Sequence, residues 1–283
     1  MADDAKLAAL RETIGGLESA LVAYSGGADS ALVLKVAHQA LGERALGVIA
    51  CSPSYPESER RDAVALAEQL GAPVIQVQTD EMDDPNYVAN RGDRCYFCKH
   101  ELFTKLESLR AERGFAAILD GYNADDVGDY RPGIQAAREH HVRHPLQEVG
   151  LSKAEIREIS RELGLPTWDK PAMACLSSRI PHGTPIQIGM LQQVDDAEQL
   201  LRRLGFRQLR VRHHNKIARI EVESSELPRL LEPAIRDQIV RELRKLGYGF
   251  VTVDLAGYRM GGGLNEAAVG TLPVYPAEPI ASR

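Results

Sequence analysis

The chain lacks any apolar stretch long enough to cross a membrane, and its acidic start, Met1-Ala2-Asp3-Asp4, is unlike a secretion signal. We therefore expect a cytoplasmic protein with no membrane contact. An excess of basic residues is also missing: the formal net charge is -6, which argues against an extended nucleic-acid-binding surface. Neither an internal repeat nor a low-complexity segment is present. The length of 283 residues suits one large globular domain or two modest ones.

Cysteine is scarce, and four thiols in a cytoplasmic chain are not a disulfide framework. Their placement makes them candidate ligands or nucleophiles instead. Cys51 ends an apolar run and is interpreted as a small buried apolar residue. Cys95 and Cys98 have the C-x-x-C spacing, which alone fits a redox pair, a zinc half-site, a cluster half-site or chance. Cys175 lies near Arg179 in a loop of small residues, an electropositive setting that lowers a thiol pKa.

Two cysteines at C-x-x-C spacing and a third far along the chain match an iron–sulfur cluster with one iron left open. A zinc ion would need a fourth ligand, for which His100 is the candidate. The alternative, that none of the three thiols meets a ligand, stays open.

Short apolar segments alternate with amphipathic ones over the first 170 residues. Strands are expected at residues 21–24, 45–50, 73–78, 116–120 and 142–146, and helices at 30–41, 57–70, 99–113 and 152–163. Buried strands that alternate with helices predict an α/β fold, with a parallel sheet covered by helices on both faces. Such folds bind their ligands at the carboxyl ends of the strands.

The pattern changes after about residue 184. The expected elements are a helix at 188–204, paired strands at 208–213 and 217–222 around Asn215, a helical stretch at 225–246 broken at Pro233, and a strand at 249–255. This order predicts a small α+β domain with an antiparallel sheet. We therefore divide the chain into domains at 1–183 and 184–270, followed by an extended tail at 271–283.

The most specific local feature is the segment Ser25-Gly26-Gly27-Ala28-Asp29-Ser30, between an expected strand and an expected helix. Consecutive glycines let backbone N–H groups turn toward one point, and the helix N-terminus adds partial positive charge. The hydroxyls of Ser25 and Ser30 add donors. The segment matches neither the Walker A motif nor the dinucleotide G-x-G-x-x-G motif. It predicts an anion-binding loop of another kind.

Asp29 within this loop implies a divalent cation, because a carboxylate beside phosphates would repel them unless Mg²⁺ intervened. The alternative role is a helix N-terminal carboxylate favoured by the dipole. A second polar segment, Asp120-Gly121-Tyr122-Asn123-Ala124-Asp125-Asp126, follows the fourth expected strand. Gly121 allows close approach of a ligand, and Asn123 and Asp125 supply polar groups. A solvated turn is the alternative, but converging strand ends favour a second wall of the same site.

Arg210 and Arg212 alternate along one expected strand and therefore face the same side of it. Two neighbouring guanidiniums repel each other unless an anion lies between them, so the pair suits a carboxylate or a phosphate. A solvated basic strand is equally compatible with this spacing.

In combination these segments resemble the LarE family, the ATP-dependent sulfur transferases of nickel-pincer cofactor synthesis for lactate racemase. LarE belongs to the PP-loop ATP pyrophosphatase superfamily. The resemblance covers roughly residues 21–259. Besides the loop at 25–30, it rests on Ser52-Pro53 with Glu57, Arg94-Cys95-Tyr96-Phe97-Cys98-Lys99, Asp120–Asp126, His144-Pro145-Leu146, Lys170–Arg179 and Arg210-Val211-Arg212.

The resemblance implies a Rossmann-like parallel sheet of the adenine nucleotide alpha hydrolase type. It also implies a reaction in which ATP adenylylates a carboxylate of a pyridinium dicarboxylate mononucleotide, and sulfur then displaces AMP to give a thiocarboxylate. Both carboxylates react in turn. A homo-oligomer is implied as well, with a hexamer as one form.

Residue roles follow from the same resemblance. ATP is expected to bind at Ala23, Ser25, Gly26, Gly27, Asp29, Ser30, Gly121 and Asn123. The anionic substrate is expected at Arg179, Arg210, Arg212 and Asp125, with Mg²⁺ at Asp29 and with Cys175, Asp29 and Arg179 as catalytic residues. Cys95, Cys98 and Cys175 are expected to hold a [4Fe–4S] cluster that carries the sulfide, as in one branch of the family.

Other interpretations of the function stay open. In the other branch, a cysteine at the position of Cys175 gives up its own sulfur and the C-x-x-C pair is not needed. A tRNA thiolase of the same superfamily is the nearest rival, followed by ATP-dependent amide formation, as in NAD or GMP synthesis. A non-enzymatic nucleotide or redox sensor is the alternative from a different class.

Overall fold

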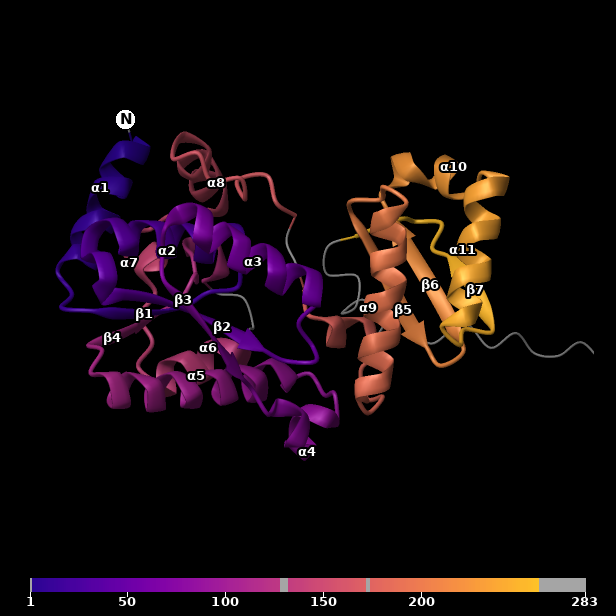
Figure 1. The fold of residues 1–283 in the computed structure, drawn as a ribbon, viewed down its shortest axis with the longest axis horizontal. Coiled ribbons are helices and arrows are strands. Elements are labelled where there is room, and N and C mark those ends of the chain that lie inside the picture. Colours follow the sequence, from indigo (N-terminus) through magenta and orange to yellow (C-terminus); the bar gives the residue numbers. More distant parts are fainter. Residues whose placement is uncertain (1, 128–131, 172–173, 260–283) are drawn as a thin grey trace, which may run out of the picture.

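The computed structural model describes residues 2–127, 132–171 and 174–259. Two groups of elements, each around its own sheet, lie side by side in Figure 1. The first sheet is parallel with the strand order β3-β2-β1-β4. Its strands are β1 (Ala20–Ala23), β2 (Ala45–Cys51), β3 (Val74–Gln78) and β4 (Ala117–Leu119). The predicted α/β fold with a parallel sheet is confirmed.

Helices cover both faces of this sheet because alternate residues of its strands point to opposite sides. In β1, Ala20 and Val22 enter the core beneath one group of helices, and Leu21 and Ala23 enter the core beneath the other. The first group is α1 (Ala2–Gly15), α2 (Ala28–Leu41), α3 (Glu57–Leu70), α7 (Pro145–Glu148) and α8 (Lys153–Glu162). The second is α5 (Arg94–Arg113) and α6 (Pro132–Glu139), with the short α4 (Pro85–Val88) before α5.

Two expectations for this part of the chain were wrong. The strand expected at 142–146 is reduced to a single bridge between Leu119 and Arg143, because Pro145 starts α7 at a position where its missing N–H costs nothing. The helix expected from residue 99 begins at Arg94 instead, so Cys95 and Cys98 lie in its first turns.

The second sheet has the order β5-β6-β7, with β5 (Leu209–His214), β6 (Ile217–Val222) and β7 (Phe250–Val253). β5 and β6 are antiparallel around Asn215, whose φ is 55°, but β7 runs parallel to β6. The expected antiparallel sheet is therefore a mixed sheet. The helices α10 (Leu227–Leu230) and α11 (Pro233–Lys245) carry the chain back between β6 and β7, which is the connection that parallel neighbours require.

Helix α9 (Ile188–Arg203) packs its apolar residues into the core of this second sheet and also toward the first group of elements. A separate apolar cluster joins Tyr87 of α4 to Leu176, Ile180, Leu191 and other residues of the segment before and within α9. The domain boundary at 183/184 stays a prediction, and the tail at 271–283 lies outside the described residues. Among the described helices, none is both long and apolar enough to cross a membrane.

Candidate functional site

The glycine-rich loop connects β1 to α2 and is held in shape from three directions. Gly26 has a φ of +65°, and a Cβ at this position would lie 2.6 Å from the Cβ of Ala63 on α3, so only glycine fits. The Ser30 hydroxyl accepts the backbone N–H of Ser25 at 3.2 Å. The hydroxyl of Tyr55 donates to the backbone carbonyl of Ser25 at 2.8 Å. The loop therefore presents a fixed backbone at the N-terminus of α2, as an anion site requires.

The segment after β4 forms a wall against this loop. A Cβ at Gly121 would lie 2.8 Å from the backbone nitrogen of Ser30 and 3.1 Å from the Cβ of Asp29, so the two segments touch. Asn123 is buried, and its side-chain oxygen accepts the backbone N–H of Asp125 at 3.0 Å. The structure thus brings Gly121 and Asn123 to the predicted place, although Asn123 serves the turn itself.

Asp29 meets a lysine that was not predicted. The ammonium of Lys153, the first residue of α8, contacts one carboxylate oxygen of Asp29, and the other oxygen is buried without a hydrogen-bond partner in the described structure. Burial raises the pKa of Asp29, and Lys153 opposes that effect. No local sequence signal marks Lys153, because the two residues meet only through the packing of α2 and α8.

The unpartnered oxygen of Asp29 fits a hard cation such as Mg²⁺ in its donor chemistry. Within the described residues, no group of three or more His, Cys, Asp or Glu side chains is gathered tightly enough to hold a metal ion. A magnesium ion at Asp29 would therefore take its remaining ligands from phosphate oxygens and water.

Lys170, five residues before Cys175 in the chain, contacts the glycine-rich loop. Its ammonium donates to the backbone carbonyl of Gly26 at 3.1 Å and pairs with the Glu59 carboxylate on α3 at 2.8 Å. Farther along, the backbone N–H of Leu176 donates to the carbonyl of Ser54 at 2.8 Å, beyond the end of β2. Cys175 is thereby held at the carboxyl edge of the parallel sheet, on the side where the loop lies.

One buried cation, Arg94, contacts Cys175 and lies on α5 together with Cys95 and Cys98. A guanidinium nitrogen of Arg94 lies 3.8 Å from the sulfur of Cys175. Burial raises the pKa of Cys98 to about 12, and the charges of Glu81 and Cys175 add to the effect. Loss of solvation around the sulfur also raises the pKa of Cys95, although this residue as a whole is exposed. Within the described residues, Cys95, Cys98 and Cys175 do not form a group at the spacing of metal ligands.

A buried carboxylate that was also not predicted lies on the Cys98 side of this group. Glu81 is 1% exposed; one oxygen accepts the hydroxyls of Ser52 and Ser54, and the other has no partner in the described structure. Its charge contributes, after burial, to the raised pKa of Cys98. The sequence marked the Ser52 segment but not Glu81, which comes from a different loop.

The predicted substrate arginines differ in what they already bind. Arg179 is 2% exposed, and its guanidinium forms two hydrogen bonds with Glu198, at 2.8 and 3.1 Å. Arg212 is paired in the same way with Glu221, at 2.9 and 3.3 Å. Arg212 is therefore not a free cation beside Arg210, as the spacing suggested, and Arg179 is also already paired with a carboxylate.

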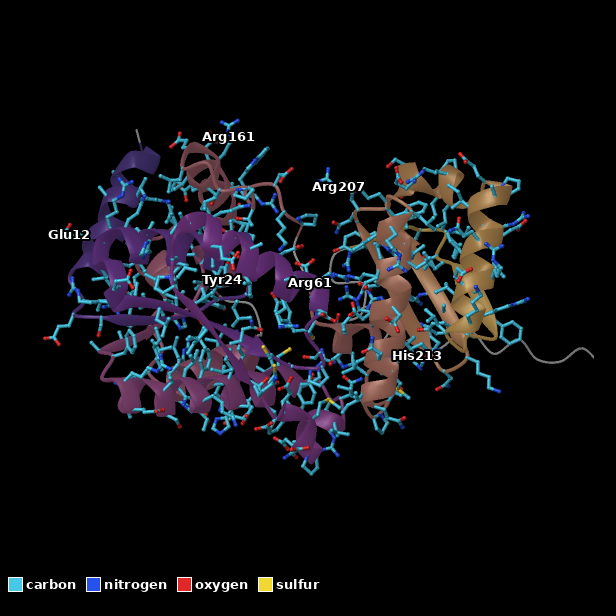
Figure 2. All side chains as sticks on the ribbon, in the orientation of Figure 1. Glu12, Tyr24, Arg61, Arg161, Arg207 and His213 are labelled. Carbon is cyan, nitrogen blue, oxygen red and sulfur yellow. The ribbon has the colours of Figure 1, made fainter. Side chains whose placement is uncertain are left out.

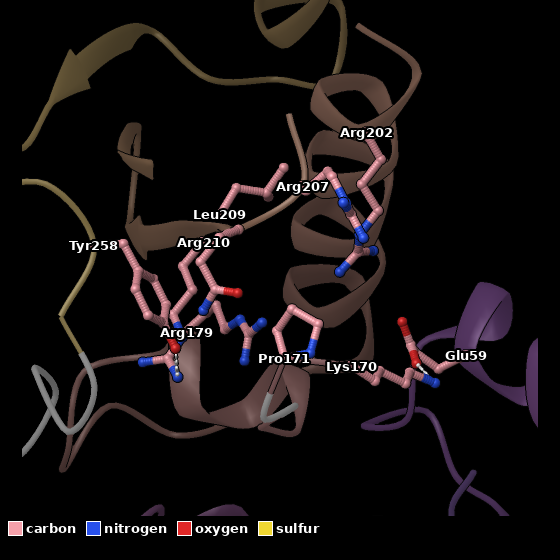
Figure 3. Close-up of a pocket in the computed structure, with 10 residues that line it drawn as sticks. Glu59, Lys170, Pro171, Arg179, Arg202, Arg207, Leu209, Arg210 and Tyr258 are labelled. Carbon is pink, nitrogen blue, oxygen red and sulfur yellow. Dashed lines mark hydrogen bonds and ion pairs between the residues drawn. The ribbon is translucent and has the colours of Figure 1, made fainter. Parts of the chain in front are cut away.

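Arg210 stacks over the ring of Tyr258, 4.7 Å from its centroid, and donates to its hydroxyl at 3.0 Å. It lines a cavity of about 90 Å³ that also contains Arg202 and Arg207, which were not predicted (Figure 3). Arg207 lies on the side of the second group of elements that faces the first (Figure 2). With Arg179 and Lys170, the lining contains five cationic side chains and one carboxylate, that of Glu59, which is paired with Lys170. Such a cavity suits an anionic group.

A parallel sheet with a glycine-rich anion loop between β1 and α2 defines a class, the PP-loop ATP pyrophosphatases. Comparison supports this class, because the family model described as NAD synthase matches residues 8–90. The ammonia-dependent NAD(+) synthetase of Methanococcoides burtonii is 49% identical over 53% of this chain and 59% of its own length. Enzymes of this class use ATP, and so does this chain.

Two relatives extend over nearly the whole chain. An uncharacterized protein of Synechocystis is 48% identical over 91% of this chain and 96% of its own length. The pyridinium-3,5-bisthiocarboxylic acid mononucleotide synthase of Lactiplantibacillus plantarum is 40% identical over 90% of this chain and 92% of its own length. The chain belongs to the family of this synthase, the LarE family.

Proposed function

We propose that the chain is an ATP-dependent sulfur transferase that converts the carboxylates of pyridinium-3,5-biscarboxylic acid mononucleotide to thiocarboxylates for nickel-pincer cofactor synthesis. The observation that carries the proposal is a pair of contacts, one made by Lys170 with the anion loop and one made by Cys175 with Arg94. Lys170 binds the carbonyl of Gly26, and Cys175 lies against the guanidinium of Arg94. An acyl group activated at the loop would therefore form close to sulfur.

The reaction has two balanced steps. A substrate carboxylate oxygen attacks the α-phosphorus of ATP, so that a P–O bond forms and pyrophosphate leaves. A sulfur nucleophile then attacks the acyl carbon, and AMP leaves with the former carboxylate oxygen. The fixed amides of the loop at 25–30 and the ammonium of Lys153 stabilise the charge that develops on the leaving phosphates. Mg²⁺ held at Asp29 would screen the same charge.

For the sulfur source we propose the thiols of Cys95, Cys98 and Cys175 as ligands of a [4Fe–4S] cluster. When bound, the cluster would supply an iron position that no protein thiol occupies, suited to a sulfide. Thiolates are the ligands that such clusters take, and the guanidinium of Arg94 lies 3.8 Å from the sulfur of Cys175. A sacrificial Cys175 would leave the other two thiols without a role.

The cation-lined cavity is our candidate for the anionic groups of the substrate. Arg210 offers its guanidinium there without a carboxylate partner in the described structure, whereas Arg179 lines the same cavity but is paired with Glu198. Arg212 does not line the cavity and is paired with Glu221. Asp125 and Asn123 remain candidates at the opposite wall. The mononucleotide is a small-molecule partner, and the net charge of -6 argues against nucleic acid as a binding partner.

A homo-oligomer in the cytoplasm completes the proposal. Ile217 of the central strand β6 is paired with Phe250 of the edge strand β7, and the two residues are 38% and 65% exposed. Adjacent exposed apolar side chains beside the edge of a sheet are suited to contact between copies of the chain.

The proposed function is tested by anaerobic incubation of the reconstituted protein with ATP, Mg²⁺, sulfide and the pyridinium dicarboxylate mononucleotide. Mass spectrometry should show the oxygen-to-sulfur exchange on both carboxylates, with one pyrophosphate and one AMP released per exchange. An absence of thiocarboxylate despite ATP binding, or amide formation when ammonia replaces sulfide, would refute the proposal.

A further inference from the structure

A second cavity, of about 410 Å³, is lined by residues at the carboxyl edge of the parallel sheet and by residues of α9. Cys51 and Gln78, the last residues of β2 and β3, line it together with Tyr55. Helix α9 contributes three further residues, among them Asp195. The volume is that of a small-molecule site, for which about 300–1,000 Å³ is usual. Both groups of elements therefore contribute to this cavity.

The cavity adjoins the glycine-rich loop. Tyr55, one of its lining residues, donates its hydroxyl hydrogen to the backbone carbonyl of Ser25 at 2.8 Å. β2 is hydrogen-bonded to β1, so the carboxyl end of β2 is the neighbouring strand end on one side of the loop. On the β4 side of β1, the wall at Gly121 closes against Ser30. An ATP molecule with its phosphates at the loop would therefore place its nucleoside in the cavity on the β2 side, outside the carboxyl ends of the strands.

Asp195 brings to this cavity a buried carboxylate with an unused acceptor. The residue is 6% exposed; one oxygen accepts the side-chain amide of Gln199 at 2.9 Å, and the other is buried with no hydrogen-bond partner in the described structure. Burial raises the pKa of Asp195, and hydrogen bonds from Gln199 and from the backbone of Glu57 oppose that effect. A buried acceptor that lacks a donor is unfavourable, so this oxygen suits a ligand that supplies one.

The nucleoside of ATP can supply this donor, and the phosphates cannot. A triphosphate offers anionic acceptors, which the Asp195 carboxylate would repel, whereas the adenine amine and the ribose hydroxyls donate hydrogen bonds. Other lining residues fit the same ligand. The side-chain amides of Gln76 and Gln78 both donate and accept, as the edge of a base requires, and Leu176 and Leu191 offer apolar contact to its face.

We propose that this cavity binds the nucleoside of ATP and that Asp195 accepts a hydrogen bond from it, which makes a residue of the second group of elements part of the nucleotide site. The donor is the adenine amine or a ribose hydroxyl, two groups with the same chemistry toward a carboxylate. The inference rests on the use of ATP in the proposed function, and not on its acyl substrate or its source of sulfur. It follows that α9, the helix that carries Asp195, responds to the nucleoside as well as to the phosphates.

The test is equilibrium binding of ATP, ITP, 2′-deoxyATP and 3′-deoxyATP to the full chain, for the wild type, Asp195→Ala, Asp195→Asn and Asp196→Asn. Asp196 is adjacent in the sequence but does not line the cavity, so its substitution is the matched control. ITP lacks the amine, and each deoxynucleotide lacks one hydroxyl. The wild type should bind the analogue that lacks the donor about tenfold or more weakly than it binds ATP. The identity of that analogue distinguishes the amine from the hydroxyls.

The variants separate a contact with the nucleoside from a structural role. Asp195→Ala should bind ATP as weakly as that analogue and lose the discrimination. Asp195→Asn, which keeps an acceptor oxygen, should retain part of it, and Asp196→Asn should retain all of it. A merely structural Asp195 would change the affinity for all four nucleotides by one factor. Such a uniform change, or a wild type that binds the four nucleotides equally, would overturn the role of Asp195.

Hydrogen–deuterium exchange covers the case in which Asp195→Ala does not fold, because it needs the wild type only. The amides of α9 around Asp195 should be protected more by ATP than by inorganic triphosphate, which reaches the loop but carries no nucleoside. Equal protection by both ligands would contradict the inference. A wild type that binds no ATP would refute this inference and the proposed function together. A wild type that shows the discrimination but makes no thiocarboxylate would refute the function alone.

Discussion

Replacement of Gly121 by alanine tests the contact between the two walls of the ATP site. The added Cβ would lie 2.8 Å from the Ser30 nitrogen and 3.1 Å from two atoms of Asp29. These neighbours are mainly backbone at the start of α2, so they cannot swing aside as a flexible side chain would. To restore ordinary contact, the loop must move by about 0.6 Å.

Such a displacement has two consequences of known size. Overpacking of this kind costs about 1–3 kcal/mol of unfolding free energy. A shift of the phosphate-binding amides by a sizeable fraction of an ångström should reduce kcat/KM for ATP by about 10- to 100-fold. We expect Gly121→Ala to show both effects, the first in urea unfolding and the second in pyrophosphate release.

Gly92→Ala is the matched control, because no atom lies within 4 Å of the Cβ that it would add and its φ is not left-handed. Its kcat/KM should equal that of the wild type. If Gly121→Ala folds and releases pyrophosphate at the wild-type rate and affinity, then the two segments do not form one nucleotide site, and the placement of Gly121 in that site is refuted.

Three further substitutions test other parts of the account. Glu198→Ala leaves the guanidinium of Arg179 buried without its carboxylate and should cost about 3–5 kcal/mol in urea unfolding; a loss below about 1 kcal/mol would contradict the pairing. The hydrogen bond from Lys6 lowers the pKa of Glu155 to about 2, so this carboxylate stabilises the fold above its unfolded pKa near 4.5 and loses its effect as the pH falls toward 2. Glu155→Gln should therefore cost about 1 kcal/mol at pH 7 and nothing near pH 2, whereas a constant difference in unfolding free energy would exclude the ionic contribution. Arg210→Met should raise the KM for the mononucleotide about tenfold with kcat unchanged, and an unchanged KM would remove Arg210 from the substrate site.

Local features were predictable from the sequence wherever one segment contains the whole signal. The loop at 25–30, the helix at 57–70 and the hairpin turn at Asn215 each depend on spacing within a few residues, and the structure has them there. Pro145 limited the expected fifth strand to one bridge. The direction of β7 could not be predicted, because it depends on how α10 and α11 return the chain across the second sheet.

The partners of site residues that lie far away in the sequence could not be predicted from local sequence patterns. Whether Arg179 and Arg212 are free cations depends on Glu198 and Glu221, which no spacing rule connects to them. Lys153 reaches Asp29 from 124 residues away, and only the packing of α8 against α2 brings it there. The sequence supplied the types of residue that the chemistry needs, and the tertiary structure decides which of them are already neutralised.

The most direct test of the central claim, that three thiols act together as the sulfur site, is the intact mass of the protein after anaerobic turnover in the presence of sulfide. The account predicts that the wild type forms more than one thiocarboxylate per chain with no change in protein mass, and that Cys95→Ala and Cys98→Ala form none. A wild type that loses the mass of one H₂S per chain, together with variants that still complete a single turnover, would contradict it and leave Cys175 as a sacrificial donor.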